Sequence, residues 1–384
     1  MKKVVQCFEE FLKESRMAVF DPESHHGHWH QLTVRTTLGS QIMAVVEFHP
    51  QHLSQEELDG VKSSLVHYFS EGSGKSAMIT SLYFHQSRAR SIKEEKTLPF
   101  EHIHGELHIY EDLLGMKFRI SPDSFFQVNT LAAELLYNQI IDWCDIQPNT
   151  VVLDICCGTG TIGLCVAKKA SKVIGFEMCK QAVEDAKANA QLNGVTNIEF
   201  HCGKVEDIIN GVMKTVHMSH VVAIVDPPRA GLHKSVIKAL RSCSHLQRIV
   251  YASCSPKSVK PNFTDLIRKK SKKHHGGSFL PVRAIPVDLF PQTSHCELVV
   301  LFERLTPTSI KIPIQSESTS PQTLSETLTI TKSPTQSEST NPQALSETLT
   351  ITQSESTSQV IQSETLTITK IPKQSESTSV LIHH

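Results

Sequence analysis

One cysteine, Cys254, stands where nucleophilic chemistry is favoured. It lies in the run SCSPK, which ends a strand-like apolar segment, and Pro256 and Lys257 then begin a predicted helix. A helix N-terminus and a nearby ammonium group both stabilise a thiolate, the reactive form of cysteine. Most of the ten cysteines are expected to be small buried apolar residues instead. Cys254 is therefore the candidate nucleophile.

A glycine-rich loop supplies a second chemical signal. Gly158, Gly160 and Gly163 spell GxGxxG directly after a predicted strand and at the start of a predicted helix. Glycines permit a tight turn there and let a ligand approach the backbone closely. Glu177 ends the next strand 19 positions after Gly158, where a carboxylate accepts hydrogen bonds from both hydroxyls of an adenosine ribose. This spacing suits NAD and S-adenosylmethionine equally, and a purely structural glycine turn is the third interpretation.

A rigid loop further along the chain favours the methyl donor. The run DPPR from Asp226 to Arg229 follows the fourth predicted strand, and its paired prolines fix an extended loop at the carboxyl edge of the sheet. Ligands bind at that edge in such folds, and a dehydrogenase has no use for this loop. Asp154, at the end of the first strand, adds a second acid near the amino-acid half of the cofactor. We therefore expect S-adenosylmethionine rather than a dinucleotide.

A thiolate beside a methyl donor suits methylation of carbon 5 of a pyrimidine. This carbon is too weak a nucleophile to take a methyl group unaided, but addition of a thiolate at carbon 6 makes an enolate-like centre at carbon 5. The proton on carbon 5 must then leave, so a general base is required. Glu297, in the turn between the last two predicted strands, is the candidate base. Without the context of Cys254 it would be an ordinary glutamate at a strand edge.

The elements that must hold these residues alternate from Val151 onward. Continuous apolar strands bounded by amphipathic helices predict a doubly wound, mostly parallel α/β sheet. The last two strands, within residues 281–290 and 297–304, are joined by a loop too short for a helical crossover. We therefore expect them to form an antiparallel hairpin at one side of the sheet.

The chain divides into three predicted segments. Residues 1–115 predict a small α+β domain on the substrate side, with a hairpin over residues 31–49 and a helix over residues 53–69. Residues 116–305 hold the predicted doubly wound domain. Residues 306–384 repeat the phrases QSEST and SETLTIT, whose few apolar side chains are too little to offset chain entropy. We expect a disordered low-complexity tail, with β association of the LTIT phrases as the alternative.

Composition limits the partners and the compartment. Residues 1–305 carry 34 Lys and Arg against 32 Asp and Glu, so a nucleic acid must be held by local patches. No apolar run approaches the roughly 18–20 residues of a membrane span, and no membrane partner is expected. The histidines around Gly27 lack a second ligand cluster, so no metal site is expected. Glu9, Glu10 and Glu14 disfavour a transit peptide, which favours a cytosolic or nuclear protein over a mitochondrial one.

Five ordered runs carry a family resemblance. They are SPDSFFQVNT (Ser121 to Thr130), LDICCGTGTIGL (Leu153 to Leu164), DPPRAGLH (Asp226 to His233), YASCSP (Tyr251 to Pro256) and DLFPQTSHCE (Asp288 to Glu297). Together they resemble the RNA 5-methyluridine methyltransferase family over about residues 6–305. The resemblance implies a class I, Rossmann-like methyltransferase that uses S-adenosylmethionine. The implied substrate is a uridine of the tRNA T-loop, which must leave its stacked position to reach a thiolate.

The resemblance also implies roles for single residues. Cys254 matches the nucleophile of the family and Glu297 its proton acceptor. Phe125 and Phe126 suit either core packing or stacking on a base, and we expect core packing of at least one. Arg229 suits a phosphate or base edge, or equally an internal salt bridge. The candidate cofactor-binding residues are Gln127, Asp154, Gly158, Gly160, Glu177 and Asp226, and the candidate substrate residues are Phe126 and Arg229.

Two other functions stay open on the sequence alone. Cytosine carbon 5 would be methylated by the same thiolate chemistry, although that enzyme class usually carries a Pro-Cys loop where this chain has DPPR. A tRNA-binding or folding-assisting protein with weak or lost catalysis is the second alternative. Animal members of the resembled family typically carry an RNA-recognition-motif domain upstream, and no aromatic RNP-type run stands at the start of this chain. We therefore expect reduced affinity for tRNA, and the repeat tail has no counterpart in that family.

Overall fold

The computed structural model describes residues 1–87, 98–215, 220–271 and 275–305, and three strands beyond them. The chain forms two compact units, Met1–Ile310 and Lys311–His384. The predicted boundary near residue 115 lies inside the first unit, in the turn of a hairpin, and the predicted boundary at residue 305 lies close to the division between the units. Both boundaries stay predictions. Among the described residues, no helix is long and apolar enough to cross a membrane.

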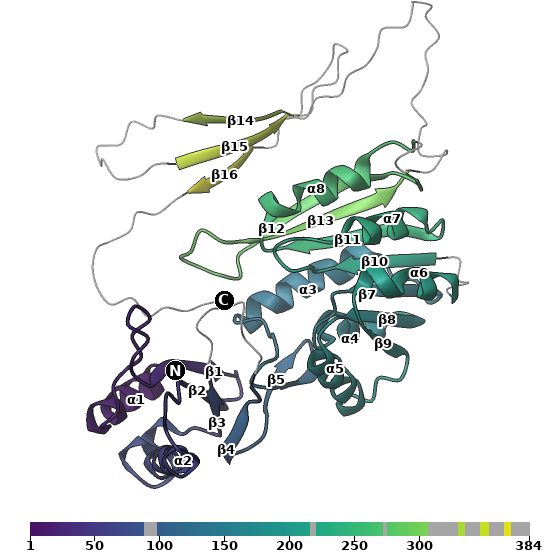
Figure 1. Ribbon diagram of the computed structural model, residues 1–384. Coiled ribbons are helices and arrows are strands. Elements are labelled where there is room, and N and C mark those ends of the chain that lie inside the picture. The colour runs from purple at the N-terminus through teal and green to yellow at the C-terminus, as the bar shows by residue number, and fades with distance from the viewer. Residues whose placement is uncertain are drawn as a thin grey trace, which may run out of the picture. The chain divides into compact units, whose positions relative to one another are not determined.

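A four-stranded sheet with two α-helices forms the N-terminal part of the first unit (Figure 1). The predicted hairpin is present as its first two strands, and Ser54 and Glu57 form a capping box at the N-terminus of the predicted helix. Alternate strand residues, such as Val46 and Phe84, are buried against the helices. The elements are α1 (Lys2–Glu14), β1 (Trp29–Thr36), β2 (Ile42–Phe48), α2 (Gln55–Ser70), the 3-10 helix η1 (Ser73–Ala77), β3 (Ser81–Gln86) and β4 (Glu101–Gly105), with strand order β1-β2-β3-β4.

A second hairpin connects this small sheet to the larger one. It consists of β5 (Ile109–Leu113) and β6 (Met116–Ile120), and the sequence pattern did not predict it. Leu114 and Gly115 in its turn have φ angles of 51° and 69°, the left-handed values that suit a tight two-residue turn. Leu113 and Phe118 are fully buried and belong to the core of the larger sheet. The hairpin therefore packs against both the small sheet and the larger sheet.

The larger sheet is seven-stranded in the described part of the chain and has the predicted doubly wound character. Five adjacent strands, from β11 to the edge strand β9, are parallel, whereas β13 is antiparallel to β11 and β12, which confirms the predicted hairpin. The strand order reverses between β7 and β10, and such a reversal opens a crevice at the carboxyl ends where ligands bind. The strands are β7 (Thr150–Ile155), β8 (Lys172–Glu177), β9 (Ile198–Cys202), β10 (His220–Val225), β11 (Leu246–Ser253), β12 (Phe279–Val287) and β13 (Glu297–Arg304), in the order β12-β13-β11-β10-β7-β8-β9.

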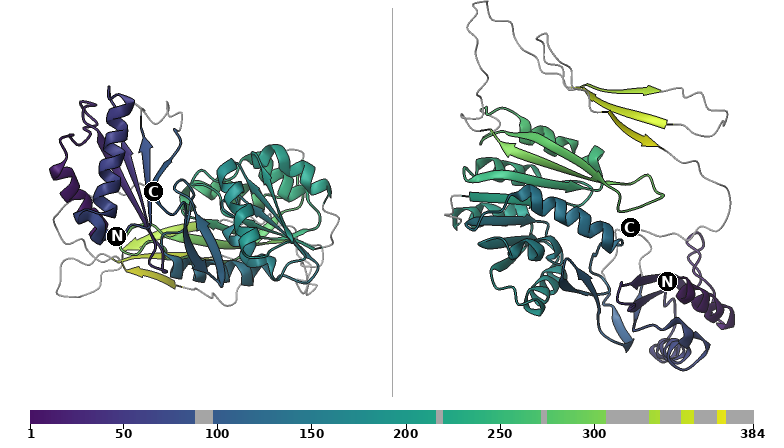
Figure 2. Two further views of the ribbon diagram at one scale, coloured as in Figure 1. Left: turned by 90° about the horizontal axis from the view of Figure 1, so that it is seen from below. Right: turned by 180° about the vertical axis from the view of Figure 1, so that it is seen from behind.

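Helices cover both faces of this sheet (Figure 2). The strand side chains alternate accordingly, because Val152 and Val250 pack with one set of helices whereas Val151 and Ile249 pack with the other. Strands buried on both faces are continuous apolar runs, which made them recognisable in the sequence. One face carries α3 (Thr130–Cys144), α4 (Thr161–Ala167) and α5 (Lys180–Leu192), and the other carries α6 (Val205–Thr215), α7 (Lys234–Ser242) and α8 (Pro256–Ile267).

The second unit contains three short strands drawn from the repeated phrases. They are β14 (Thr329–Pro334), β15 (Ser346–Thr352) and β16 (Thr365–Thr369), and they pair antiparallel in that order. The strands correspond to the alternative that the sequence left open, in which the LTIT phrases associate. The predicted disorder of the remaining tail falls on residues outside the described ones.

Candidate active site

The residues predicted to do chemistry come together at the carboxyl edge of the larger sheet. Cys254 directly follows β11, Asp226 directly follows β10, and Glu297 is the first residue of β13. Ser253 pairs with Leu298 across β11 and β13, so Cys254 and Glu297 stand at the next position of the same register. Because β7 is parallel to β10, the glycine loop that follows β7 opens at this edge as well.

The thiol of Cys254 lies between groups of opposite charge. Burial and the Glu297 carboxylate raise its pKa, whereas a hydrogen bond from the Arg229 side chain lowers it, and the net effect is a raised pKa. The helix expected to start at Pro256 does so, but the cation beside the thiol is Arg229. Lys257 is exposed instead, because the first turn of α8 presents it to solvent. The thiol is therefore predominantly protonated at neutral pH until a substrate or base changes its surroundings.

The carboxyl group of Glu297 has a pKa near neutrality. Its side chain is 5% exposed, and its Oε2 atom has no hydrogen-bond partner among the described residues. Burial, and secondly the Asp226 carboxylate, raise its pKa to about 7. Burial also raises the pKa of Asp226 to about 6. General base catalysis is most effective when the pKa of the base lies near the working pH, and Glu297 meets that condition.

Two carboxylates hold the glycine loop. Asp154 Oδ2 accepts a hydrogen bond from the Gly163 N–H at 2.8 Å, and a Cβ at Gly163 would lie only 2.6 Å from that oxygen, so only glycine fits. Glu177 accepts a hydrogen bond from the Gly158 N–H at 3.0 Å. Gly158 and Gly160 have φ angles of 56° and 78°, which a residue with a side chain rarely adopts. The space beside Gly158, where a Cβ would stand, is open.

Asp154 retains one unused oxygen. Its side chain is 1% exposed, and Oδ1 has no hydrogen-bond partner within the described structure. Burial raises the pKa of this carboxyl to about 7. A buried polar atom without a partner is costly, and such atoms are uncommon unless a ligand or water satisfies them. The atom is therefore a candidate contact for a ligand at this end of the glycine loop.

The run that carries Gln127 lies between β6 and α3. Phe126 packs against the cores on both sides, whereas Phe125 is 69% exposed. Gln127 itself is buried, at 8% exposed. Phe126 was the predicted substrate residue, but in the structure it is Phe125 that is accessible for stacking on a base. Neighbouring residues of an extended run point to opposite sides, so the two phenylalanines do not share one environment.

Residues of the small sheet and hairpin hold this run at both ends, and the sequence analysis missed them. Arg35 of β1 donates a hydrogen bond to the carbonyl oxygen of Ser124. Glu111 of β5 accepts hydrogen bonds from the Leu38 N–H at 3.1 Å and from the Thr130 hydroxyl at 2.9 Å. Thr130 is the first residue of α3. These partners are 19 to 89 residues apart, so no local pattern marks them.

Asn189 of α5 connects the β5–β6 hairpin to the glycine loop. Its fully buried side chain accepts a hydrogen bond from the Arg119 N–H at 2.7 Å and donates one to the carbonyl oxygen of Thr159 at 3.1 Å. Asn193, one helical turn further on, accepts from the Lys117 N–H at 2.9 Å. Only an amide both donates and accepts at this length, which explains asparagine at the bridging position.

The variant Asn189→Asp is expected to weaken binding of S-adenosylhomocysteine, the demethylated form of the expected cofactor, by about tenfold. Aspartate keeps an acceptor for Arg119 but loses the donor to Thr159, and an unsatisfied buried group costs roughly 1–3 kcal/mol. Titration calorimetry measures the change. Asn193→Asp is the matched control, because Asn193 bonds the same hairpin without touching the glycine loop. Equal losses of affinity in both variants would contradict a specific link to the loop.

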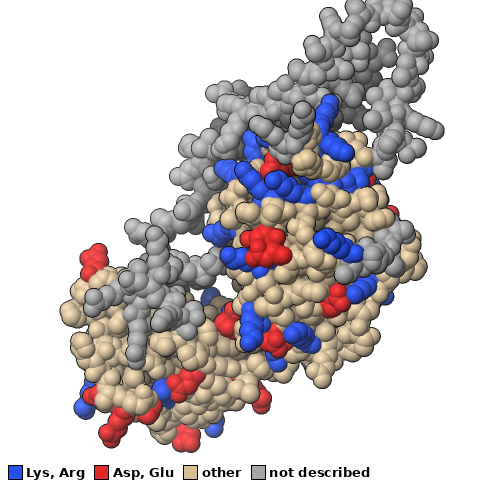
Figure 3. Space-filling model, turned by 45° about the vertical axis from the view of Figure 1, so that its right-hand side comes forward, with Lys and Arg blue, Asp and Glu red and all other residues tan. Residues whose placement is uncertain are grey.

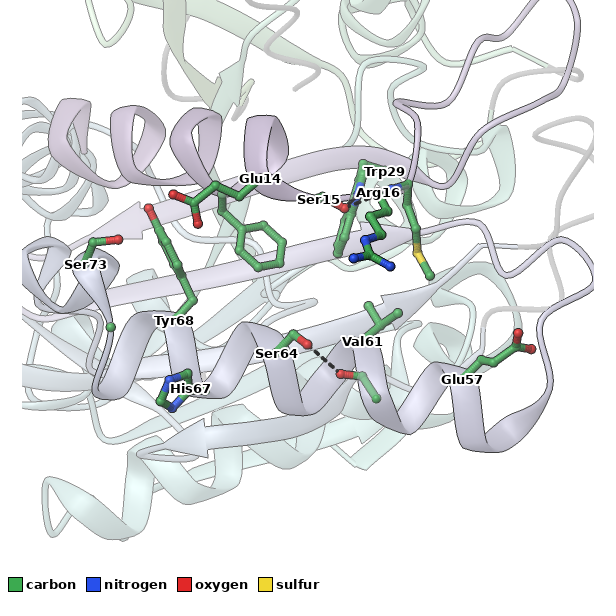
Figure 4. Close-up of a pocket in the computed structure, with 14 residues that line it drawn as sticks. Glu14, Ser15, Arg16, Trp29, Glu57, Val61, Ser64, His67, Tyr68 and Ser73 are labelled. Atoms are coloured by element: carbon green, nitrogen blue, oxygen red, sulfur yellow. Dashed lines mark hydrogen bonds between the residues drawn. The ribbon is translucent and has the colours of Figure 1, made fainter.

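A pocket of about 730 Å³ lies elsewhere, between α1 and α2 (Figure 4). Trp29 and Tyr68 contribute aromatic lining, and Arg16 and Glu57 contribute charge. None of the predicted site residues lines this pocket, so it is separate from the sheet edge. In the described ranges, no group of His, Cys, Asp and Glu side chains is arranged to hold a metal ion.

The fold defines the class of protein first. The chain resembles the crystal structure of Pyrococcus abyssi tRNA (uracil-54, C5)-methyltransferase in complex with S-adenosyl-L-homocysteine, with a TM-score of 0.60 and 24% sequence identity. The match covers 78% of this chain and 66% of the other. The doubly wound domain is thus a class I methyltransferase fold, as predicted.

The family follows from the sequence comparisons. The chain belongs to the tRNA (uracil-5-)-methyltransferase family, whose model matches residues 6–305. It is 51% identical over 304 residues to the human tRNA (uracil-5-)-methyltransferase homolog A and 48% identical over 327 residues to the mouse homolog A. These alignments cover 79% and 85% of this chain but 49% and 53% of the relatives, so the chain spans about half their length. The family predicted from the five runs is confirmed.

Proposed function

We propose that this protein is an S-adenosylmethionine-dependent tRNA uracil-5-methyltransferase that modifies a uridine of the T-loop. The observation that carries the proposal is the register of β11 and β13, which sets Cys254 beside Glu297 at the edge where the glycine loop opens. A nucleophile and a base at that edge are what carbon-5 methylation of a pyrimidine needs. Membership of the family supports uracil as the base, and the family resemblance supports the T-loop position.

The residues around the glycine loop fit the cofactor. Asp154 Oδ1 offers an acceptor that lacks a partner in the described structure, and the open space beside Gly158 admits a ligand close to the backbone. Glu177 already orders this loop through the Gly158 N–H. The buried amide of Gln127 suits the amino-acid end of the molecule. When bound, S-adenosylmethionine supplies a methyl group on a positively charged sulfur. After the transfer, that sulfur is part of a neutral thioether.

Cys254 and Glu297 act in sequence on the uracil ring. The Cys254 thiolate forms a carbon–sulfur bond at carbon 6, and the electrons of the carbon 5–carbon 6 double bond move to carbon 5, which takes the methyl group. Glu297 then removes the proton from carbon 5. The electron pair left behind restores the double bond and breaks the carbon–sulfur bond, which returns the thiolate. The raised pKa of Glu297 makes it a strong enough base for this step near neutral pH.

An assay with unmodified tRNA transcript and labelled methyl donor tests the proposal. We expect the label in 5-methyluridine at the T-loop position, and no label in a transcript whose T-loop uridine is replaced by cytidine. Label in the cytidine transcript would favour a cytosine methyltransferase instead. Binding of tRNA without transfer at saturating donor would favour the tRNA-binding or folding-assisting alternative.

The variant Arg229→Met is expected to raise the pKa of the Cys254 thiol and to move the rise of activity with pH to higher pH. The hydrogen bond and charge of Arg229 lower that pKa, and each unit by which it rises reduces the thiolate fraction about tenfold below the pKa. The pH profile of the single-turnover rate constant measures the shift. Arg283→Met, an exposed arginine of β12, serves as the control and should leave the profile unchanged.

A further inference from the structure

Charge is unevenly distributed along the first unit. Residues 1–305 carry 34 Lys and Arg against 32 Asp and Glu, which is close to neutral. The segment from Lys234 to Ser271 carries nine of those cations and a single acid, Asp265. The rest of residues 1–305 therefore has 25 cations against 31 acids and is net acidic. The positive charge of the protein is concentrated in the part of the chain that forms α7, β11 and α8.

The three arginines among these nine cations have partners within the fold, and one of them, Arg268, pairs with Asp265. Arg241 is buried and donates hydrogen bonds to the carbonyl oxygens of Asp265 and Leu266. Arg248 forms ion pairs with Asp145 and Glu303. These guanidinium groups are already bonded within the fold, so they are less available to bind an anionic ligand.

The lysines of the segment have no such partners. All six are exposed, and none forms an ion pair with another residue in the described part of the chain. Exposed lysines without acids nearby repel one another, and the repulsion is relieved by an anion. We call these six residues the basic α7–α8 surface; they are Lys234, Lys238, Lys257, Lys260, Lys269 and Lys270.

The basic α7–α8 surface starts at the catalytic edge. α7 begins a few residues after Asp226, and α8 begins two residues after Cys254, so both helices run away from that edge. The two helices pack against each other on one face of the sheet. Lys257 and Lys260 are three residues apart and lie on one side of α8. Figure 3 shows Lys and Arg gathered over the upper part of the face that it presents, with few Asp and Glu among them.

We propose that the basic α7–α8 surface binds the phosphate backbone of the tRNA stem that adjoins the target uridine. The proposal rests on the proposed function, because the surface matters to catalysis only if the base enters at Cys254. RNA is the polyanion that must approach this edge, and phosphate contacts from lysines position a nucleic acid without reading its sequence. The twelve residues of α8 rise about 18 Å, so the surface extends well beyond a single flipped nucleotide.

The length of α8 separates near contacts from far ones. Lys257 and Lys260, the near pair, lie in the first turns of α8 beside the catalytic edge. Lys269 and Lys270, the far pair, follow the end of α8. A distance of about 18 Å spans several base pairs of an A-form RNA stem. The near pair should therefore contact the first phosphates next to the loop, and the far pair should contact phosphates deeper in the stem.

Salt-dependent binding of full-length tRNA transcript tests the surface. Each lysine that contacts a phosphate contributes about one unit to the slope of log Kd against log salt concentration. We expect Lys257→Gln with Lys260→Gln, and separately Lys269→Gln with Lys270→Gln, to lower the slope by about two units each. Lys168→Gln with Lys169→Gln is the matched control, since these exposed lysines follow α4 on the opposite face of the sheet, and its slope should equal that of the wild type.

A shortened substrate distinguishes the near pair from the far pair. On a hairpin that keeps the T-loop and only about two base pairs of stem, the near pair should still lower the slope and the far pair should not. Binding of S-adenosylhomocysteine, measured on the same variants, should stay at the wild-type value and show that they are folded. If both double variants bind full-length tRNA with the salt slope of the wild type and still methylate it, the proposed role of the basic α7–α8 surface is wrong. Absence of tRNA binding and of methylation in the wild type would instead overturn the proposed function, and this proposal with it.

Discussion

Replacing Cys254 by Ala is expected to abolish methyl transfer, with kcat reduced roughly 10⁴-fold or more. Carbon 5 of uracil gains its nucleophilic character only when a thiolate adds at carbon 6, and alanine offers no atom that can add. The register of β11 and β13 sets Cys254 beside Glu297, so both residues stand at one strand end. Incorporation of labelled methyl groups into tRNA transcript under single-turnover conditions measures the loss.

Cys296 provides the matched control for this experiment. It lies at the same edge, directly before Glu297, and its side chain is largely exposed. Partial desolvation and the neighbouring Glu297 carboxylate raise the pKa of its thiol. Cys296→Ala should retain activity within about threefold of the wild type, since changes away from the reacting atoms are usually small. Binding of S-adenosylhomocysteine should be similar in both variants, which separates chemistry from folding. Loss of transfer in Cys296→Ala alone would show that the nucleophile is misassigned.

The catalytic edge was predictable from the sequence because parallel strands impose it. Once the apolar runs before Asp226 and Cys254 are recognised as parallel strands, their ends must meet the glycine loop at one edge. Glu297 joins them because the last two strands are too close in sequence for a crossover, so the final strand must run back from that edge. These inferences use only the pattern of apolar residues, the lengths of the connecting loops and the directions of the strands.

The neighbours of the catalytic residues were not predictable in the same way. The expectation that Lys257 assists the thiol used proximity in sequence, whereas Arg229, one strand away, makes the contact. Arg35 and Asn189 act on loops far from them in sequence, through hydrogen bonds to backbone carbonyl groups. A backbone acceptor carries no signature in a single sequence. The Asn189 contact depends on the packing of β6 against α5, which the sequence did not reveal.

Replacing Glu297 by Gln is expected to trap a covalent adduct between the protein and tRNA. Glutamine has nearly the same shape, so addition of Cys254 and methyl transfer should still occur, but the amide cannot take the carbon 5 proton. Loss of a general base typically reduces turnover by about 10²–10⁴-fold. The adduct should appear as a band of reduced mobility in a denaturing gel. It should be absent from the double variant that also carries Cys254→Ala.

Glu303→Gln is the control for the base. Glu303 belongs to the same strand, β13, but lies near its far end and pairs with Arg248. This variant should turn over normally and leave no adduct. An adduct of equal yield in both variants would mean that the trapped species does not report proton removal by Glu297.

The pKa of Glu297 also predicts the direction of the pH dependence. Burial and then Asp226 raise that pKa from the ordinary value of 4.5 to about 7, and only the carboxylate can accept the proton. Release of the adduct should therefore be slow below pH 6 and rise through about pH 7. The fold prefers the protonated form, so Glu297 should make the free energy of unfolding fall as pH rises from about 4.5 to about 7. Glu297→Gln should flatten the pH dependence of adduct release, and it should make the fall of stability with pH less steep. Asp154 and Asp226, whose pKa values burial also raises, should keep their own contributions to that fall.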